Sequence, residues 1–122
     1  MSQVRVAVIG CTGRMGRALL RLLREERDMQ LAAAVTIPTD TAIGVDAGTL
    51  AGGDPLGLPV SDAPPNACDV AIEFTDPGGV RAWSQWCAGQ GVALVSGTTG
   101  LADPERALLA QAAKRVPVLW SP

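Results

Sequence analysis

Histidine is absent from this chain of 122 residues. Because histidine is the commonest general acid–base near neutral pH and a common zinc ligand, its absence argues against both roles within these residues. Cysteine is scarce as well: Cys11, Cys68 and Cys87 are odd in number, far apart, and form no CxxC pair. A disulfide framework and a Cys/His zinc site are therefore poorly supported, and no metal site is expected.

The chain also lacks an excess of either charge, with 10 basic and 12 acidic residues. This balance offers no basic field for nucleic acid or for an anionic membrane surface. No uninterrupted apolar run reaches the roughly 18 residues of a membrane span, and the first residues resemble a strand rather than a leader. We expect a soluble, cytoplasmic protein. A hydrophobic content of 48% is enough for one compact domain over residues 1–122.

What the chain does contain is a GxxGxxG turn made by Gly10, Gly13 and Gly16. It follows an apolar run at 4–9, which predicts a strand, and it precedes an amphipathic run from Arg14 onward, which predicts a helix. Glycines in this position let the backbone approach a diphosphate closely, and the helix N-terminus offers free N–H groups. The pattern therefore predicts a dinucleotide-binding turn, the alternative being close helix–strand packing alone.

Strand and helix patterns alternate along the rest of the chain, which is typical of a parallel α/β sheet. The segment 39–66 is rich in Gly, Pro, Asp and Ala and predicts a long loop with ordered pieces at 46–52 and 58–60. The fold we expect is a single Rossmann-like, doubly wound parallel sheet. Its further strands are predicted at 31–35, 70–74, 92–96 and 116–120, and its further helices at 78–90 and from Asp103-Pro104 onward.

Ligands of such sheets bind beyond the carboxyl ends of the strands. The residue that usually selects the cofactor stands about 20 positions after the glycine turn, and an acid there binds the ribose hydroxyls of NAD. Here that position is Thr36, followed by Ile37 and Pro38, so no carboxylate is present. Arg14 lies just inside the turn and is within reach of a 2′-phosphate. The choice between NADH and NADPH stays open.

Four further features bear on the site, and three of them have two interpretations. Cys11, near a helix N-terminus, has either a stabilised thiolate or simply a small side chain in a crowded loop, and the second is favoured. Glu73 is expected to be partly buried against a polar partner. Trp83 and Trp86 fit helix packing better than a ligand platform. The GTTG segment at 97–100 is either a plain turn or part of the cofactor groove.

Taken in series, four segments resemble the N-terminal domain of the dihydrodipicolinate reductase family: VIGCTGRMGR at 8–17, DAGTLAG at 46–52, VAIEFT at 70–75 and VSGTTGL at 95–101. The resemblance implies an oxidoreductase of diaminopimelate and lysine biosynthesis that transfers hydride from NADH or NADPH to a cyclic imine. The cofactor contacts that it implies are Gly10, Cys11, Thr12, Gly13, Arg14, Met15, Thr36, Gly97, Thr98, Thr99, Ser121 and Pro122.

The chain departs from the family in three respects. Family members often have an acid in place of Thr36 and a basic residue in place of Ile37, and Glu73 replaces their usual aspartate. Their catalytic segment, with a histidine pair and a lysine, lies in a substrate domain that is absent from this sequence. We therefore expect no catalytic residue here, no turnover by the chain alone, and self-association through uncovered apolar surface. The alternative is a stand-alone nucleotide-binding or sensing module without catalysis.

Overall fold

Strands and helices alternate along the chain in the computed structural model, which describes residues 3–122. No helix in that range has the length and apolar character that a membrane crossing needs. The elements are β1 (Val4–Ile9), α1 (Arg14–Glu25), β2 (Met29–Val35), α2 (Ala47–Leu50), β3 (Val70–Glu73), α3 (Pro77–Gln90), β4 (Ala93–Ser96), α4 (Asp103–Ala112) and β5 (Val118–Trp120).

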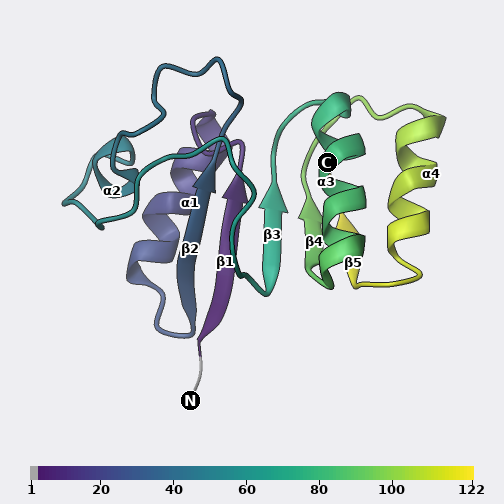
Figure 1. Cartoon of the computed structure of the whole chain (residues 1–122), viewed down its shortest axis with the longest axis horizontal. Coiled ribbons are helices and arrows are strands. Elements are labelled where there is room, and N and C mark those ends of the chain that lie inside the picture. Colours follow the sequence, from purple (N-terminus) through teal and green to yellow (C-terminus); the bar gives the residue numbers. More distant parts are fainter. Residues whose placement is uncertain (1–2) are drawn as a thin grey trace.

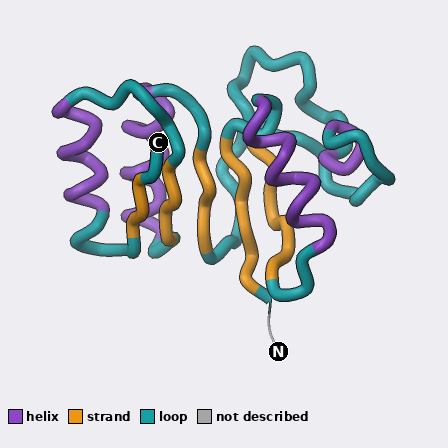
Figure 2. Tube along the Cα trace, turned by 180° about the vertical axis from the view of Figure 1, so that it is seen from behind, coloured by secondary structure: helices purple, strands orange, loops and turns teal. Residues whose placement is uncertain are grey.

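The five strands form one parallel sheet in the order β2-β1-β3-β4-β5 (Figure 1). The chain therefore winds outward in both directions from the boundary between β1 and β3, as expected for a doubly wound sheet. Figures 1 and 2, seen from opposite sides, show α1 on one face of the sheet and α3 on the other. The predicted fold class is confirmed.

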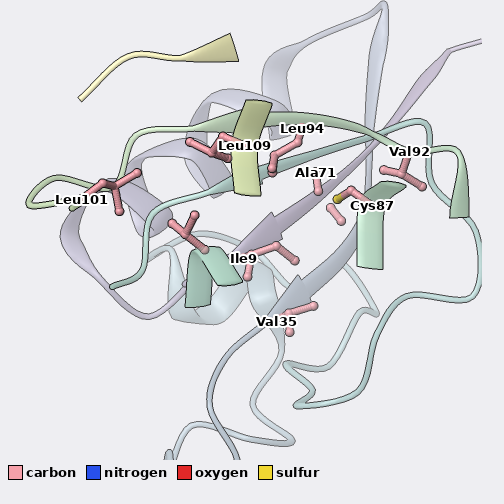
Figure 3. Close-up of a cluster of buried hydrophobic side chains, with 10 residues drawn as sticks. Ile9, Val35, Ala71, Cys87, Val92, Leu94, Leu101 and Leu109 are labelled. Atoms are coloured by element: carbon pink, nitrogen blue, oxygen red, sulfur yellow. The ribbon is translucent and has the colours of Figure 1, made fainter. Parts of the chain in front are cut away.

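Two hydrophobic cores lie on the two faces of this sheet. Ala7 and Ile9 point into the core beneath α3 and α4, shown in Figure 3, whereas Val6 and Val8 point into the core beneath α1 and α2. These four side chains are at most 2% exposed. A central parallel strand is covered on both faces, which explains why its sequence is continuously apolar rather than alternating.

The element boundaries differ slightly from those predicted. Strand β2 begins at Met29, two residues before the predicted start. Helix α4 begins at Asp103 as predicted, and the carboxylate of Glu105 accepts the Ala102 N–H at 3.0 Å. Within the long segment between β2 and β3, the ordered piece after Asp46 is the short helix α2.

Candidate functional site

The carboxyl ends of all five strands meet at one edge of the sheet, because every pair is parallel. Backbone hydrogen bonds continue past the strand ends and fix the segments there. The Gly10 N–H donates to the Val35 carbonyl at 2.9 Å, and the Phe74 N–H donates to the Ile9 carbonyl at 3.0 Å. The glycine turn is thus held where β1 lies between β2 and β3, the point at which the winding direction reverses.

Two of the three glycines are required by close packing. Gly10 has φ +84°, and a Cβ there would lie 2.1 Å from the Phe74 carbonyl oxygen; a Cβ on Gly16 would lie 2.1 Å from the Gly10 carbonyl oxygen. Gly13 is different, since its nearest contact would be an ordinary 3.6 Å. The outer glycines pack the turn against β3 and α1, whereas Gly13 has room for a Cβ.

Helix α1 begins directly after Gly13 without a side-chain cap. Gly13 is its N-cap residue, no side chain accepts a hydrogen bond from the first turn, and the turn contains no acidic residue. By contrast, α3 is capped by Asp76, whose carboxylate accepts the Gly79 N–H at 2.8 Å. The first N–H groups of α1 therefore remain for an anion, where the helix dipole favours negative charge.

Two cavities, of about 320 and 590 Å³, meet at this helix end and share Gly13, Phe74 and Thr75. The first extends toward Thr36, and the second toward the segment 97–99 and the last two residues. Of the predicted cofactor contacts, those that line one cavity or both are Gly10, Thr12, Gly13, Arg14, Met15, Thr36, Gly97, Thr98, Thr99, Ser121 and Pro122. The structure thus gathers eleven of the twelve residues around one helix end.

The remaining predicted contact, Cys11, lines neither cavity. Its side chain is 0% exposed and belongs to the core beneath α1, and its N–H donates to the Val35 carbonyl at 3.1 Å. Burial raises the pKa of the Cys11 thiol to about 11, with the charge of Asp40 acting in the same direction. The stabilised-thiolate hypothesis is wrong, and the small-side-chain interpretation is the one that fits.

A carboxylate does stand at the end of β2, four residues later than sequence counting placed it. The hydroxyl of Thr36 donates to Oδ2 of Asp40 at 2.7 Å, and the Ala42 N–H donates to Oδ1 at 2.8 Å. These hydrogen bonds, the Ala42 N–H first, hold the pKa of Asp40 below its usual value. Asp40 lines the first cavity, whereas Arg14 lines the second, away from Thr36.

Sequence counting missed Asp40 because the chain turns back on itself after β2. The Asp40 N–H donates to the Ile37 carbonyl at 3.1 Å, which closes a turn around Pro38. The signal that was available is this proline followed by Thr39 and Asp40, a combination typical of a tight turn.

Glu73 is 0% exposed at the end of β3 and accepts hydrogen bonds from three hydroxyl groups. Ser96 donates to Oε1 at 2.6 Å, Thr98 donates to Oε2 at 2.5 Å, and Thr75 also donates to Oε2. Burial against polar partners is confirmed and is complete rather than partial. The carboxylate ties the end of β3 to the 97–100 turn, which lines the second cavity.

Trp83 contributes to the site as well as to helix packing. Its ring lies 5.3 Å from that of Trp86 in an edge-to-face arrangement, and its side chain lines the first cavity. The chain's single lysine, Lys114, lies elsewhere, beside another cavity of about 410 Å³ between α3 and α4. Across residues 3–122, no cluster of three or more Cys, Asp or Glu side chains is arranged to hold a metal ion.

Comparison with known proteins agrees with this geometry. Residues 4–122 match the family model described as dihydrodipicolinate reductase, N-terminus. A 4-hydroxy-tetrahydrodipicolinate reductase of Anaeromyxobacter dehalogenans (strain 2CP-C) is 46% identical over 97% of this chain, which spans 45% of that protein's length. The chain thus spans less than half the length of the curated relatives that it matches.

Two solved structures share the fold. A dipicolinate-bound dihydrodipicolinate reductase from Paenisporosarcina sp. TG-14 superposes with a TM-score of 0.70 at 21% identity, over 98% of this chain and 47% of that one. GenD2 of gentamicin A biosynthesis, in complex with NAD, gives a TM-score of 0.74 at 19% identity, over 99% of this chain and 35% of that one. The family model, matched from the first strand to the last residue, decides the assignment: this chain belongs to the family of the dihydrodipicolinate reductase N-terminal domain.

Proposed function

We propose that this chain is the NAD(P)H-binding part of a 4-hydroxy-tetrahydrodipicolinate reductase, an oxidoreductase of diaminopimelate and lysine biosynthesis. The observation that carries the proposal is the uncapped N-terminus of α1 at the junction of two cavities. A dinucleotide has the matching shape, since two nucleoside halves extend from a central diphosphate. A bound NAD(P)H supplies the hydride.

The residues present fit this ligand from end to end. Gly13 has room for the diphosphate beside it, and the N–H groups of Arg14 and Met15 in the first turn of α1 are placed to donate to it. The first cavity, with Thr36 at one end, receives the adenosine half, and the second receives the nicotinamide half. Glu73 positions the second cavity's wall through Thr98.

The chain has no group suited to give a proton to an imine beside the nicotinamide. It contains no histidine, and Lys114 lies between α3 and α4. Reduction of an imine also needs a pocket for the substrate carboxylates. We therefore propose that these functions belong to the part of the relatives that this chain does not span, and that the chain alone gives no turnover.

A Gly13→Asp variant tests the proposal while keeping the fold. Gly13 has φ −74° and ψ 173°, which suit any residue, and aspartate is a favoured N-cap. The variant should keep or raise the unfolding temperature, yet its carboxylate occupies the anion position. Calorimetric titration of NADH and NADPH should show binding to the wild type and a loss of about 10-fold or more in the variant.

Asn66→Asp is the matched control, because it adds the same charge at an exposed residue that lines neither cavity. It should bind like the wild type. Unchanged binding by Gly13→Asp, or no binding of either nucleotide to the wild type, would contradict the proposed function.

We further propose that the chain self-associates and works in the cytoplasm. At the sheet edge, Leu119 of β5 is 59% exposed, an apolar side chain that association would cover. Light scattering should show a mass that rises with concentration, and a constant monomer mass would contradict this. The three cysteines are free, which fits a reducing compartment.

A further inference from the structure

The Asp40 carboxylate lies beside the motif position at the end of β2, where this chain has no acid. The motif residue at the end of β2 is Thr36, and the two residues after it are apolar. The turn after β2 then brings the Asp40 carboxylate back onto the Thr36 hydroxyl, at 2.7 Å. Thr12, from the glycine turn itself, places its Oγ1 3.4 Å from that of Thr36. A carboxylate is thus joined by a chain of hydroxyls to the dinucleotide turn.

The Asp40 carboxylate is fixed but not saturated. One hydrogen bond reaches each oxygen, from Thr36 and from the Ala42 N–H, and the nearby Thr12 hydroxyl also lowers the pKa of the carboxyl group. An ionised carboxylate has about four acceptor positions, so about two remain. Its lowered pKa keeps it negatively charged at neutral pH, and the carboxylate lines the first cavity. The remaining lone pairs therefore suit a pair of neighbouring hydroxyl groups, and the charge opposes a phosphate.

We propose that Asp40 selects NADH over NADPH, by accepting hydrogen bonds from the 2′- and 3′-hydroxyls of the adenosine ribose and by repelling a 2′-phosphate. The inference rests on the proposed function, since it assumes that the first cavity holds the adenosine half. It deepens that function by choosing between the two cofactors, and it assigns the choice to a residue outside the usual motif position.

The nearby cations do not reverse this preference. Arg17 contributes to lowering the pKa of Asp40, but its Nε–H donates to the Thr12 carbonyl at 2.9 Å, which directs the guanidinium toward the turn. Arg14 lines the second cavity. At the rim of the first cavity, where a basic residue would grip a 2′-phosphate, Ile37 is 62% exposed.

The test is calorimetric titration of the chain with NADH and with NADPH, for the wild type, Asp40→Asn and Asp54→Asn. Asparagine keeps an oxygen for the Ala42 N–H but removes the charge and one acceptor. Asp54 is exposed, belongs to the same segment between β2 and β3, and lines neither cavity, so its variant controls for the loss of one charge.

The wild type should bind NADH roughly 10- to 100-fold more tightly than NADPH, the ratio expected for a charge-assisted hydrogen bond. Asp40→Asn should bring the two affinities to within about threefold, mainly by weakening NADH, and Asp54→Asn should leave the ratio unchanged. If Asp40→Asn fails to fold, Asp40→Glu serves in its place: it keeps the charge, so NADPH should remain excluded while NADH weakens.

Two results would overturn the inference alone: NADPH binding to the wild type as tightly as NADH, or an NADH-to-NADPH ratio that the Asp40 variants do not change. The absence of binding of both nucleotides to the wild type would instead overturn the proposed function, and this inference with it.

Discussion

Replacing Glu73 by glutamine should destabilise the fold, because this side chain is a buried acceptor for three hydroxyl groups. Ser96 and Thr98 donate at 2.6 and 2.5 Å, and Thr75 donates as well. Hydrogen bonds to a charged group contribute about 1.5–3 kcal/mol each, so the three together amount to roughly 4–9 kcal/mol before the cost of burying the charge. An amide of the same shape retains one acceptor oxygen.

We expect Glu73→Gln to lose about 2–3 kcal/mol of unfolding free energy, since its NH₂ group cannot accept a hydrogen bond from the hydroxyl that it faces. The Thr75 proton has an alternative acceptor in the Asp76 carbonyl at 3.2 Å, which limits the loss. Urea unfolding followed by tryptophan fluorescence measures it, and Trp120 is a local reporter because its Nε1–H donates to the Thr98 carbonyl at 2.9 Å.

The control is Glu25→Gln, which removes the same charge from an exposed residue at the end of α1. It should change stability by less than about 0.5 kcal/mol. Glu73→Asp, which restores the carboxylate on a shorter side chain, should lose less than the glutamine variant. A Glu73→Gln protein as stable as the wild type would refute the reasoning, because the three hydroxyls would then need no charged acceptor.

Three further outcomes follow from the packing and the pKa shifts. Gly16→Ala should cost about 3 kcal/mol or more in denaturant unfolding, because its Cβ would lie 2.1 Å from a backbone oxygen. In contrast, Gly89 lies on α3 with open space beside it, so Gly89→Ala should raise the unfolding free energy by about 0.5–1 kcal/mol. Equal changes in stability for the two variants would contradict the packing argument. Backbone N–H groups hold the pKa of Asp46 at about 2, below the ordinary 3.8. Its stabilisation is therefore complete above pH 3.8 and lost as the pH falls toward 2, so Asp46→Asn should flatten the fall of the unfolding temperature in that range. Burial raises the pKa of all three thiols, least for the half-buried Cys68. Thiol reagents at pH 8 should therefore label Cys68 first. Faster labelling of another cysteine would count against this.

Sequence alone predicted the fold because its signals are local and periodic. The apolar run at 4–9, the glycines after it and the alternating segments downstream each predict one element, and parallel strands leave few ways to arrange them. The family resemblance supplied the twelve candidate contacts, and eleven of them line the two cavities at one helix end, as the convergence of parallel strand ends predicts.

What sequence did not predict depends on contacts between distant residues. Asp40 reaches the site only because the backbone turns after Ile37, and counting positions along the chain cannot show a turn's direction. Cys11 lies within the predicted loop, yet its side chain points into the core with Leu20. Trp83 packs against Trp86 and also lines the first cavity. Helical spacing alone predicts only the packing.

The junction of the two cavities at Gly13 makes the proposed site bivalent. A ligand whose halves occupy both cavities ties them together through one diphosphate, so once one half has bound, the other is held at a high effective concentration. Each half alone then binds weakly while the joined molecule binds well, without any contact beyond the sum of the two. If the proposed function holds, single nucleotides, which offer only one half, are poor competitors for a site that a dinucleotide fills.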